Sequence, residues 1–135
     1  MKFRVLLLCF LNLHAMPAFA ENIFVCKSEL ATGFIYKQQS WKITNFVREQ
    51  FTLKFSEDWK RLDIADSWTF FNCSQPLPYQ TDDVLYCLSK WLDGDSFQFD
   101  KTTARFKYIN PSSEGFLSKT GPDTDAFYAG TCQPF

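Results

Sequence analysis

Short runs in which apolar and polar residues alternate make up most of this chain, and no stretch sustains an apolar period of three to four residues over a helical length. Phe51, Leu53 and Phe55, for example, alternate with Thr52 and Lys54. Such alternation is typical of a strand with one buried face. The pattern predicts strands at residues 23–28, 33–36, 41–46, 51–55, 61–65, 68–73, 84–88, 96–100, 105–108 and 126–132.

The clearest local signal predicts a β-hairpin, because Phe97 and Phe99 lead through residues 101–104 to Phe106 and Tyr108 with polar residues between them. Ala31-Thr32 is expected to form a corner between the first two strands. A brief helix at residues 57–61 or 82–89 remains an alternative to strand or turn there.

These short strands, at intervals of about ten residues, predict an all-β fold for residues 21–135, as one domain. A small antiparallel meander barrel and a sandwich both fit this spacing. We favour the barrel, because closure removes exposed strand edges.

Residues 1–20 have the layout of a signal peptide. Lys2 and Arg4 precede an apolar run, and Pro17 comes just before the small-x-small site that ends at Ala20. The apolar run is shorter than the roughly 20 residues that span a bilayer. The sequence therefore predicts cleavage, a periplasmic or secreted mature protein, and no membrane span.

Four cysteines follow this segment, at Cys26, Cys73, Cys87 and Cys132, and an even number in an exported chain indicates two disulfides. They lie much farther apart than the close pairs that ligate zinc. Of the three pairings allowed, we expect Cys26 with Cys132, because a closed meander places its first and last strands side by side. Cys73 and Cys87 would then close the proline-containing loop between them.

The composition argues against several functions. His14, the single histidine, lies in the segment expected to be removed, so no histidine remains for a catalytic triad. No basic tract is present, so nucleic acid is not expected as a partner. Asp93-Gly94-Asp95 lacks the remaining ligands of a calcium loop and is better explained as a turn. We predict no catalytic residue, no metal and no cofactor, and hence no enzyme.

Several short motifs resemble a family of small, uncharacterised exported (periplasmic) proteins of Gram-negative bacteria. The resemblance rests on Cys26, on Ala31-Thr32-Gly33-Phe34, and on the closing Gly130-Thr131-Cys132, with Trp41, Asn45-Phe46 and the hairpin at 97–106 between them. It implies a shared fold and an exported location without an activity. The chain departs from the family at Asp125-Ala126, where a proline-aromatic pair is usual, so its last strand is expected to begin differently.

Two functions remain for such a domain. The first is a non-catalytic protein-binding or inhibitor-like envelope module, whose candidate binding surface comprises aromatic and apolar residues beside turns and loops: Trp59, Trp68, Leu77, Tyr79 and Trp91. The second is a carrier that holds a small apolar ligand in a barrel cavity. A protein partner is favoured over a small ligand, because the other aromatic residues are needed to fill the core.

Overall fold

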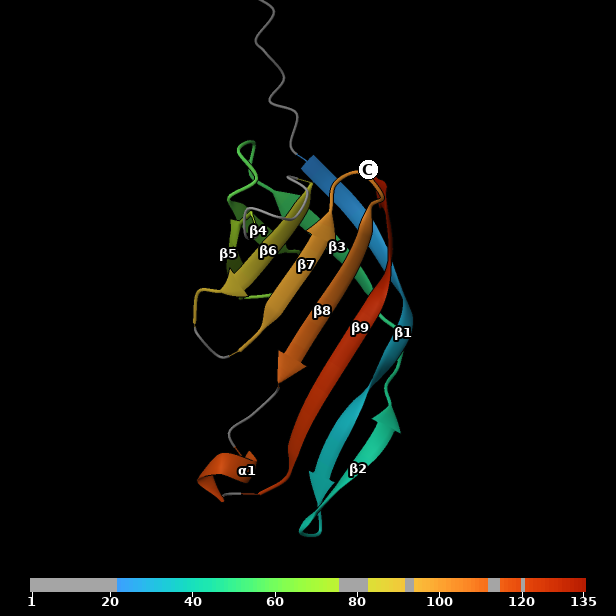
Figure 1. The fold of residues 1–135 in the computed structure, drawn as a ribbon, viewed down its shortest axis with the longest axis vertical. Helices are drawn as coiled ribbons and strands as arrows, with labels where there is room; N and C mark the ends of the chain where they lie inside the picture. The colour runs from blue at the N-terminus through green and yellow to red at the C-terminus, as the bar shows by residue number, and fades with distance from the viewer. Residues whose placement is uncertain (1–21, 76–82, 92–93, 112–114, 120) are drawn as a thin grey trace, which may run out of the picture.

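The computed structural model describes residues 22–75, 83–91, 94–111, 115–119 and 121–135 (Figure 1). A strand is found at every position where the alternation predicts one. The strands are β1 (Asn22–Lys37), β2 (Ser40–Asn45), β3 (Gln50–Phe55), β4 (Arg61–Ile64), β5 (Phe70–Ser74), β6 (Val84–Ser89), β7 (Ser96–Asp100), β8 (Arg105–Pro111) and β9 (Asp123–Pro134), with one short helix, α1 (Gly115–Ser118).

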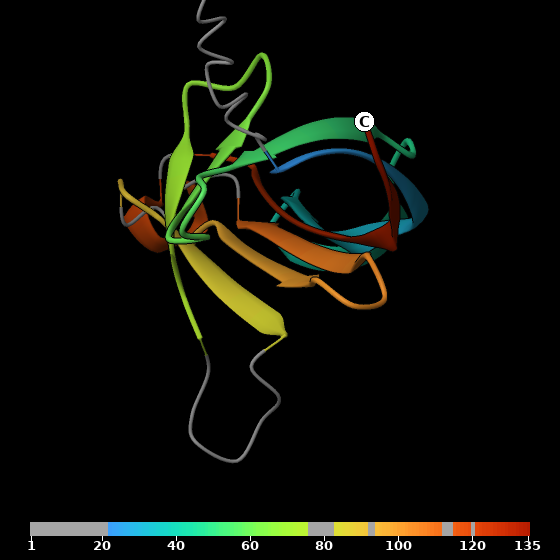
Figure 2. The ribbon, with the colours of Figure 1, turned by 90° about the horizontal axis from the view of Figure 1, so that it is seen from above.

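Eight of these strands form a closed antiparallel barrel, in the order β1-β3-β4-β5-β6-β7-β8-β9, with β9 pairing back to β1. Figure 2 looks along this barrel and shows the strands arranged around a common interior. The expected meander barrel is therefore confirmed, and the sandwich is excluded. We call the end near the C-terminus in Figure 1 the upper end and the opposite end the lower end.

Two long strands, β1 and β9, close the barrel and then run together beyond its lower end, where β2 joins them (Figure 1). The expected corner at Ala31-Thr32 is wrong, because β1 continues through it. The irregularity lies earlier, as a shift of register between Ser28 and Leu30. Small side chains explain the continuity: Gly33 lies opposite Ala126, and a Cβ at Gly33 would overlap the carbonyl oxygen of Asp125.

Neither of the alternative helices forms. Residues 57–60 make a turn, in which the amide of Trp59 donates to the carbonyl of Ser56 at 2.9 Å. Residues 84–89 form β6, because Leu85 and Cys87 both point into the core and so follow the two-residue period of a strand. The last strand starts at Asp123, three positions before the expected residue 126.

Aromatic rings fill the barrel interior. An upper group comprises Phe24, Phe55, Trp59 and Phe99, and a lower group comprises Phe51, Phe71, Phe97, Phe106, Tyr108 and Tyr128. Ring centroids within each group lie 4.9–6.4 Å apart, which is the range of favourable aromatic pairs. Phe71, Phe97 and Phe99 are fully buried.

Both expected disulfides are present. Cys26 bonds Cys132 across the β1–β9 pair, and Cys73 bonds Cys87 across the β5–β6 pair. In each case the two cysteines are register partners on adjacent strands. These bonds are consistent with an oxidising compartment.

Candidate functional site

The predicted surface residues fall into separate places. Trp59 lies at the upper end, half-buried, with its ring 5.1 Å from that of Phe55. Trp68 and Trp91 lie at the lower end, one after β4 and the other after β6. Leu77 and Tyr79 lie outside the described residues. The structure thus brings Trp68 and Trp91 to the same end of the barrel and leaves Trp59 at the other.

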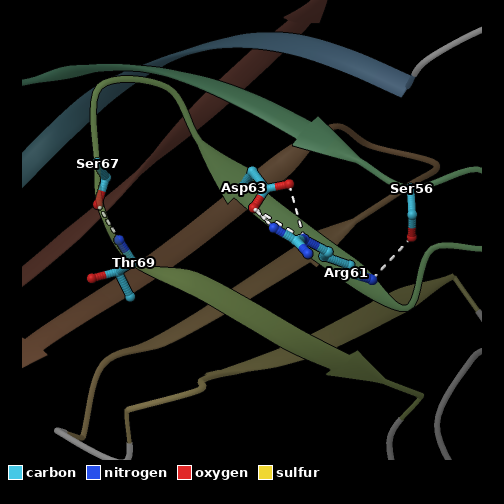
Figure 3. A network of polar contacts seen from close by, with 5 residues as sticks. All are labelled: Ser56, Arg61, Asp63, Ser67 and Thr69. Carbon is cyan, nitrogen blue, oxygen red and sulfur yellow. Dashed lines mark hydrogen bonds and ion pairs between the residues drawn. The ribbon is translucent and has the colours of Figure 1, made fainter.

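A hydrogen-bonded turn presents Trp68 to solvent. The amide of Ser67 donates to the carbonyl of Ile64 at 3.1 Å, and the amide of Thr69 donates to Ser67 Oγ at 3.1 Å (Figure 3). These two bonds fix the backbone on both sides of the tryptophan. Its side chain is 98% exposed, so it contributes nothing to the core.

Phe70 and Trp91 lie beside this turn and are linked by a lysine. The amide of Lys90 donates to the carbonyl of Phe70 at 3.0 Å, which places the end of β6 against the start of β5. Lys90 Nζ lies 4.6 Å from the ring centre of Phe70 and 5.8 Å from that of Trp91, both within cation–π range. Trp91 is 63% exposed. We refer to Trp68, Phe70, Lys90 and Trp91 as the tryptophan surface.

An arginine on β4 borders this surface. The guanidinium carbon of Arg61 lies 4.3 Å from the ring centre of Phe70, and its Nε and Nη2 donate to the carboxylate of Asp63 (Figure 3). This hydrogen-bonded ion pair raises the pKa of Arg61. Because Asp63 and Phe70 are register partners, the ion pair holds the guanidinium next to the aromatic ring.

A groove of about 880 Å³ crosses the outside of β6, β7, β8, β9 and β1, strands that lie side by side in Figure 1. Successive register partners form a row across it: Tyr86, Gln98, Lys107, Ala129 and Leu30. Leu88, 61% exposed, follows Tyr86 on the same face of β6. The outer face of β6 therefore joins the groove to the tryptophan surface.

Four charged residues line this groove. The carboxylate of Asp100 accepts hydrogen bonds from the amides of Thr102 and Thr103 at 2.9 and 3.0 Å, and the Thr103 bond is the main cause of its lowered pKa. Glu29 accepts a hydrogen bond from the hydroxyl of Thr131 at 3.0 Å. Arg105 and Lys107 form no ion pair with any described residue. The two cations are thus available to a ligand.

The sequence carries a signal for the two cations of this groove. Arg105 and Lys107 alternate with the inward Phe106 and Tyr108, so a strand there must point both cations outward. Only the register shows that Ala129 lies beside Lys107, where its small side chain leaves room for a depression.

A buried polar cluster occupies the lower end of the interior. Tyr108 donates its hydroxyl hydrogen to Asp95 at 3.0 Å, and the amide of Asn110 donates to the same carboxylate at 3.0 Å. Burial, followed by the charge of Asp95, raises the pKa of Tyr108. Within the described part of the chain, no three histidine, cysteine, aspartate or glutamate residues gather as a metal site would require. The hydrogen bonds from Tyr108 and Asn110, both on β8, hold the loop that carries Asp95 against the barrel.

Comparisons with known proteins assign no family. The sequence matches no protein-family model, and a search of curated proteins finds no match. No helix in the described residues has the length and apolar character needed to span a membrane. What the structure itself defines is a class: a small antiparallel β-barrel with two disulfides, a ring-filled interior and exposed aromatic residues.

Proposed function

We propose that this protein is a non-catalytic, inhibitor-like binding module of the bacterial envelope that contacts a protein partner through the tryptophan surface. The observation that carries the proposal is the exposure of Trp68 and Trp91 beside Phe70 and Lys90. Tryptophan is among the residues most enriched at the energetic centres of protein interfaces. The hydrogen-bonded turn already fixes the backbone on both sides of Trp68, so binding would cost little backbone entropy there.

The filled interior supports a binding module over a ligand carrier. A carrier would need an internal apolar cavity of roughly 300 Å³ or more. The interior positions of this barrel instead hold phenylalanine, tyrosine and leucine side chains in mutual contact. A small apolar ligand would have to displace rings that form the core.

The exported location is part of the proposal. Its supports are the signal-peptide pattern of residues 1–20 and the two disulfides, which persist in the periplasm or outside the cell. Rigid cross-linking of a small domain also suits a module whose function is to present a fixed surface.

The test is quantitative capture from periplasmic extract, using immobilised residues 21–135 and the double variant Trp68→Ala/Trp91→Ala. We expect the wild-type domain to retain a defined protein that the variant loses, because removing two interface tryptophans costs several kcal/mol of binding. Mass spectrometry of the eluted bands, followed by titration of the purified partner, gives the affinity change.

A matched control is Phe135→Ala, which removes an aromatic side chain that is 91% exposed and lies at the C-terminus, at the opposite, upper end of the barrel (Figure 1). It should retain the partner fully. Equal capture by the wild-type domain and the double tryptophan variant would show that this surface is not the binding site.

A further inference from the structure

We propose that the groove across β6, β7, β8, β9 and β1 binds an extended acidic segment of a protein, whose carboxylates contact Arg105 and Lys107. This is a second binding site, distinct from the tryptophan surface, and it does not depend on the function proposed for that surface.

The length of the groove favours an extended chain as the ligand. Five adjacent strands lie across it, and strands are spaced about 4.8 Å apart, so the groove is about 19 Å long. An extended peptide rises about 3.3 Å per residue, so about six residues would fill that length. A single anion would occupy only a small part of it.

The distribution of charge in the groove indicates which residue type the centre of the bound segment should contain. Arg105 and Lys107 both lie on β8, the central strand of the five, and both point outward. An arginine guanidinium can pair with a carboxylate through two parallel hydrogen bonds, and a lysine adds a second positive charge two residues along the strand. Acidic residues at the centre of the segment are therefore complementary to the groove.

The acidic residues that line the groove lie near these cations, and Asp100 attracts Arg105 electrostatically, but among the described residues neither carboxylate is directly paired with a cation. Asp100 is the register partner of Arg105, yet its carboxylate turns toward the amides of Thr102 and Thr103. Glu29 lies at the β1 end, and its carboxylate is held by the Thr131 hydroxyl. Neither carboxylate forms an ion pair with Arg105 or Lys107 in the part of the chain that the structure describes.

The side chains at the two ends of the groove indicate which residues should stand on either side of the acidic centre of the peptide. Leu30, 48% exposed, lies at the β1 end, and Val84 and Tyr86 lie at the β6 end. Apolar residues at both ends of the segment would cover these side chains. An acidic polysaccharide fits less well, because sugars favour several stacking rings and Tyr86 is the single aromatic side chain pointing into the groove from its lining residues.

Fluorescence anisotropy with a labelled synthetic peptide tests the proposal. The probe has four central glutamates flanked by leucines, and a second peptide replaces each glutamate with glutamine. We expect the wild-type domain to bind the acidic peptide about tenfold or more tightly than the glutamine peptide. Affinity for the acidic peptide should fall as salt is raised, because these exposed charges are screened.

Two charge-matched double variants locate the site. Arg105→Gln/Lys107→Gln should weaken binding of the acidic peptide by about tenfold or more, whereas Lys37→Gln/Lys42→Gln, in the β1–β2 hairpin, should leave it unchanged within about twofold. All four side chains are exposed, so both variants should fold, which thermal unfolding followed by circular dichroism verifies.

Four outcomes would overturn the proposal: no binding at millimolar peptide, equal binding of the glutamine peptide, equal loss in both double variants, or tighter binding of an oligogalacturonate of similar length. The last would assign the groove to an acidic polysaccharide. Because Trp68→Ala/Trp91→Ala leaves the groove intact, it should bind the peptide like the wild type. Failure of this proposal is thus distinguishable from failure of the tryptophan surface.

Discussion

Tyr108 combines two environments in one side chain. Its ring packs among Phe51, Phe71 and Phe97, while its hydroxyl donates to the carboxylate of Asp95. Burial disfavours the phenolate, and the negative carboxylate disfavours it further, so the pKa of Tyr108 lies well above that of a free tyrosine. Tyr128 stacks on it at 5.9 Å, and its pKa is raised by burial and by Glu49.

These raised pKa values predict loss of stability in alkali. The unfolded chain releases its tyrosine protons near pH 10, whereas the folded protein retains those of Tyr108 and Tyr128 to higher pH. The contribution is therefore fully present below about pH 10, and the free energy of unfolding falls as the pH rises above that value. Urea unfolding between pH 8 and about pH 11 measures the slope.

The variant Tyr108→Phe tests whether Tyr108 causes the loss of stability at high pH. It should destabilise the protein by about 1–3 kcal/mol at neutral pH, because Asp95 loses a buried hydrogen bond. It should also make the alkaline decline shallower. An identical pH dependence in the variant and the wild type would mean that Tyr108 does not cause the decline.

Among the strands, β1 shows how far the alternation of residues predicts an element. The pattern located its two halves, and the alternation of Phe51, Leu53 and Phe55 located β3. It did not predict that β1 runs unbroken, because Ala31-Thr32 carries no local preference for continuing. Continuity depends on β9, whose Ala126 and Gly130 allow a close approach at the matching positions. Such contacts join residues about a hundred positions apart and leave no signal in a short window.

The turn between β1 and β2 gives a prediction of its own. Gln38 and Gln39 both have positive φ, 54° and 63°, as a two-residue type I′ turn requires. Because glutamine is strained there, Gln38→Asn/Gln39→Gly should stabilise the protein by about 1 kcal/mol. Thermal and urea unfolding measure the gain. Gln38→Ala/Gln39→Ala keeps the Cβ that causes the strain, so its stability should stay about unchanged, and a similar gain in that variant would contradict the explanation.

At the scale of the whole molecule, closure and cross-linking followed from the sequence, while the surfaces did not. Cys26 and Cys132 lie in the first and last strands, so a meander had to bring them together. Whether each tryptophan is packed or exposed could not be predicted from the sequence. Trp59 and Trp68 both follow short strands and precede polar residues, yet one ring packs onto Phe55 and the other is fully exposed. That difference depends on the backbone conformation of each turn, which directs one side chain toward the core and the other toward solvent.

The two disulfides should stabilise the barrel unequally. Cys26–Cys132 closes a loop with a sequence separation of 106, and Cys73–Cys87 one of 14. In the chain-entropy model these loops are worth about 4.7 and about 3 kcal/mol. We therefore expect Cys26→Ala/Cys132→Ala to lose more stability in urea than Cys73→Ala/Cys87→Ala. All four cysteines are buried, so the packing cost is similar, and the reverse order would contradict the model.

The Cys26–Cys132 bond also determines how the domain would respond to a pulling force. The described chain ends at Asn22 and Phe135, close to these two cysteines, where the amide of Phe135 donates to the carbonyl of Ile23. Tension applied to the two ends would pass from β1 to β9 through the covalent bond and bypass residues 27–131. Those residues hold the groove, the tryptophan surface and all of the core except Phe24 and the two bonded cysteines, so these parts would remain unloaded. Pulling would extend a few terminal residues, and the barrel would resist until the bond was reduced.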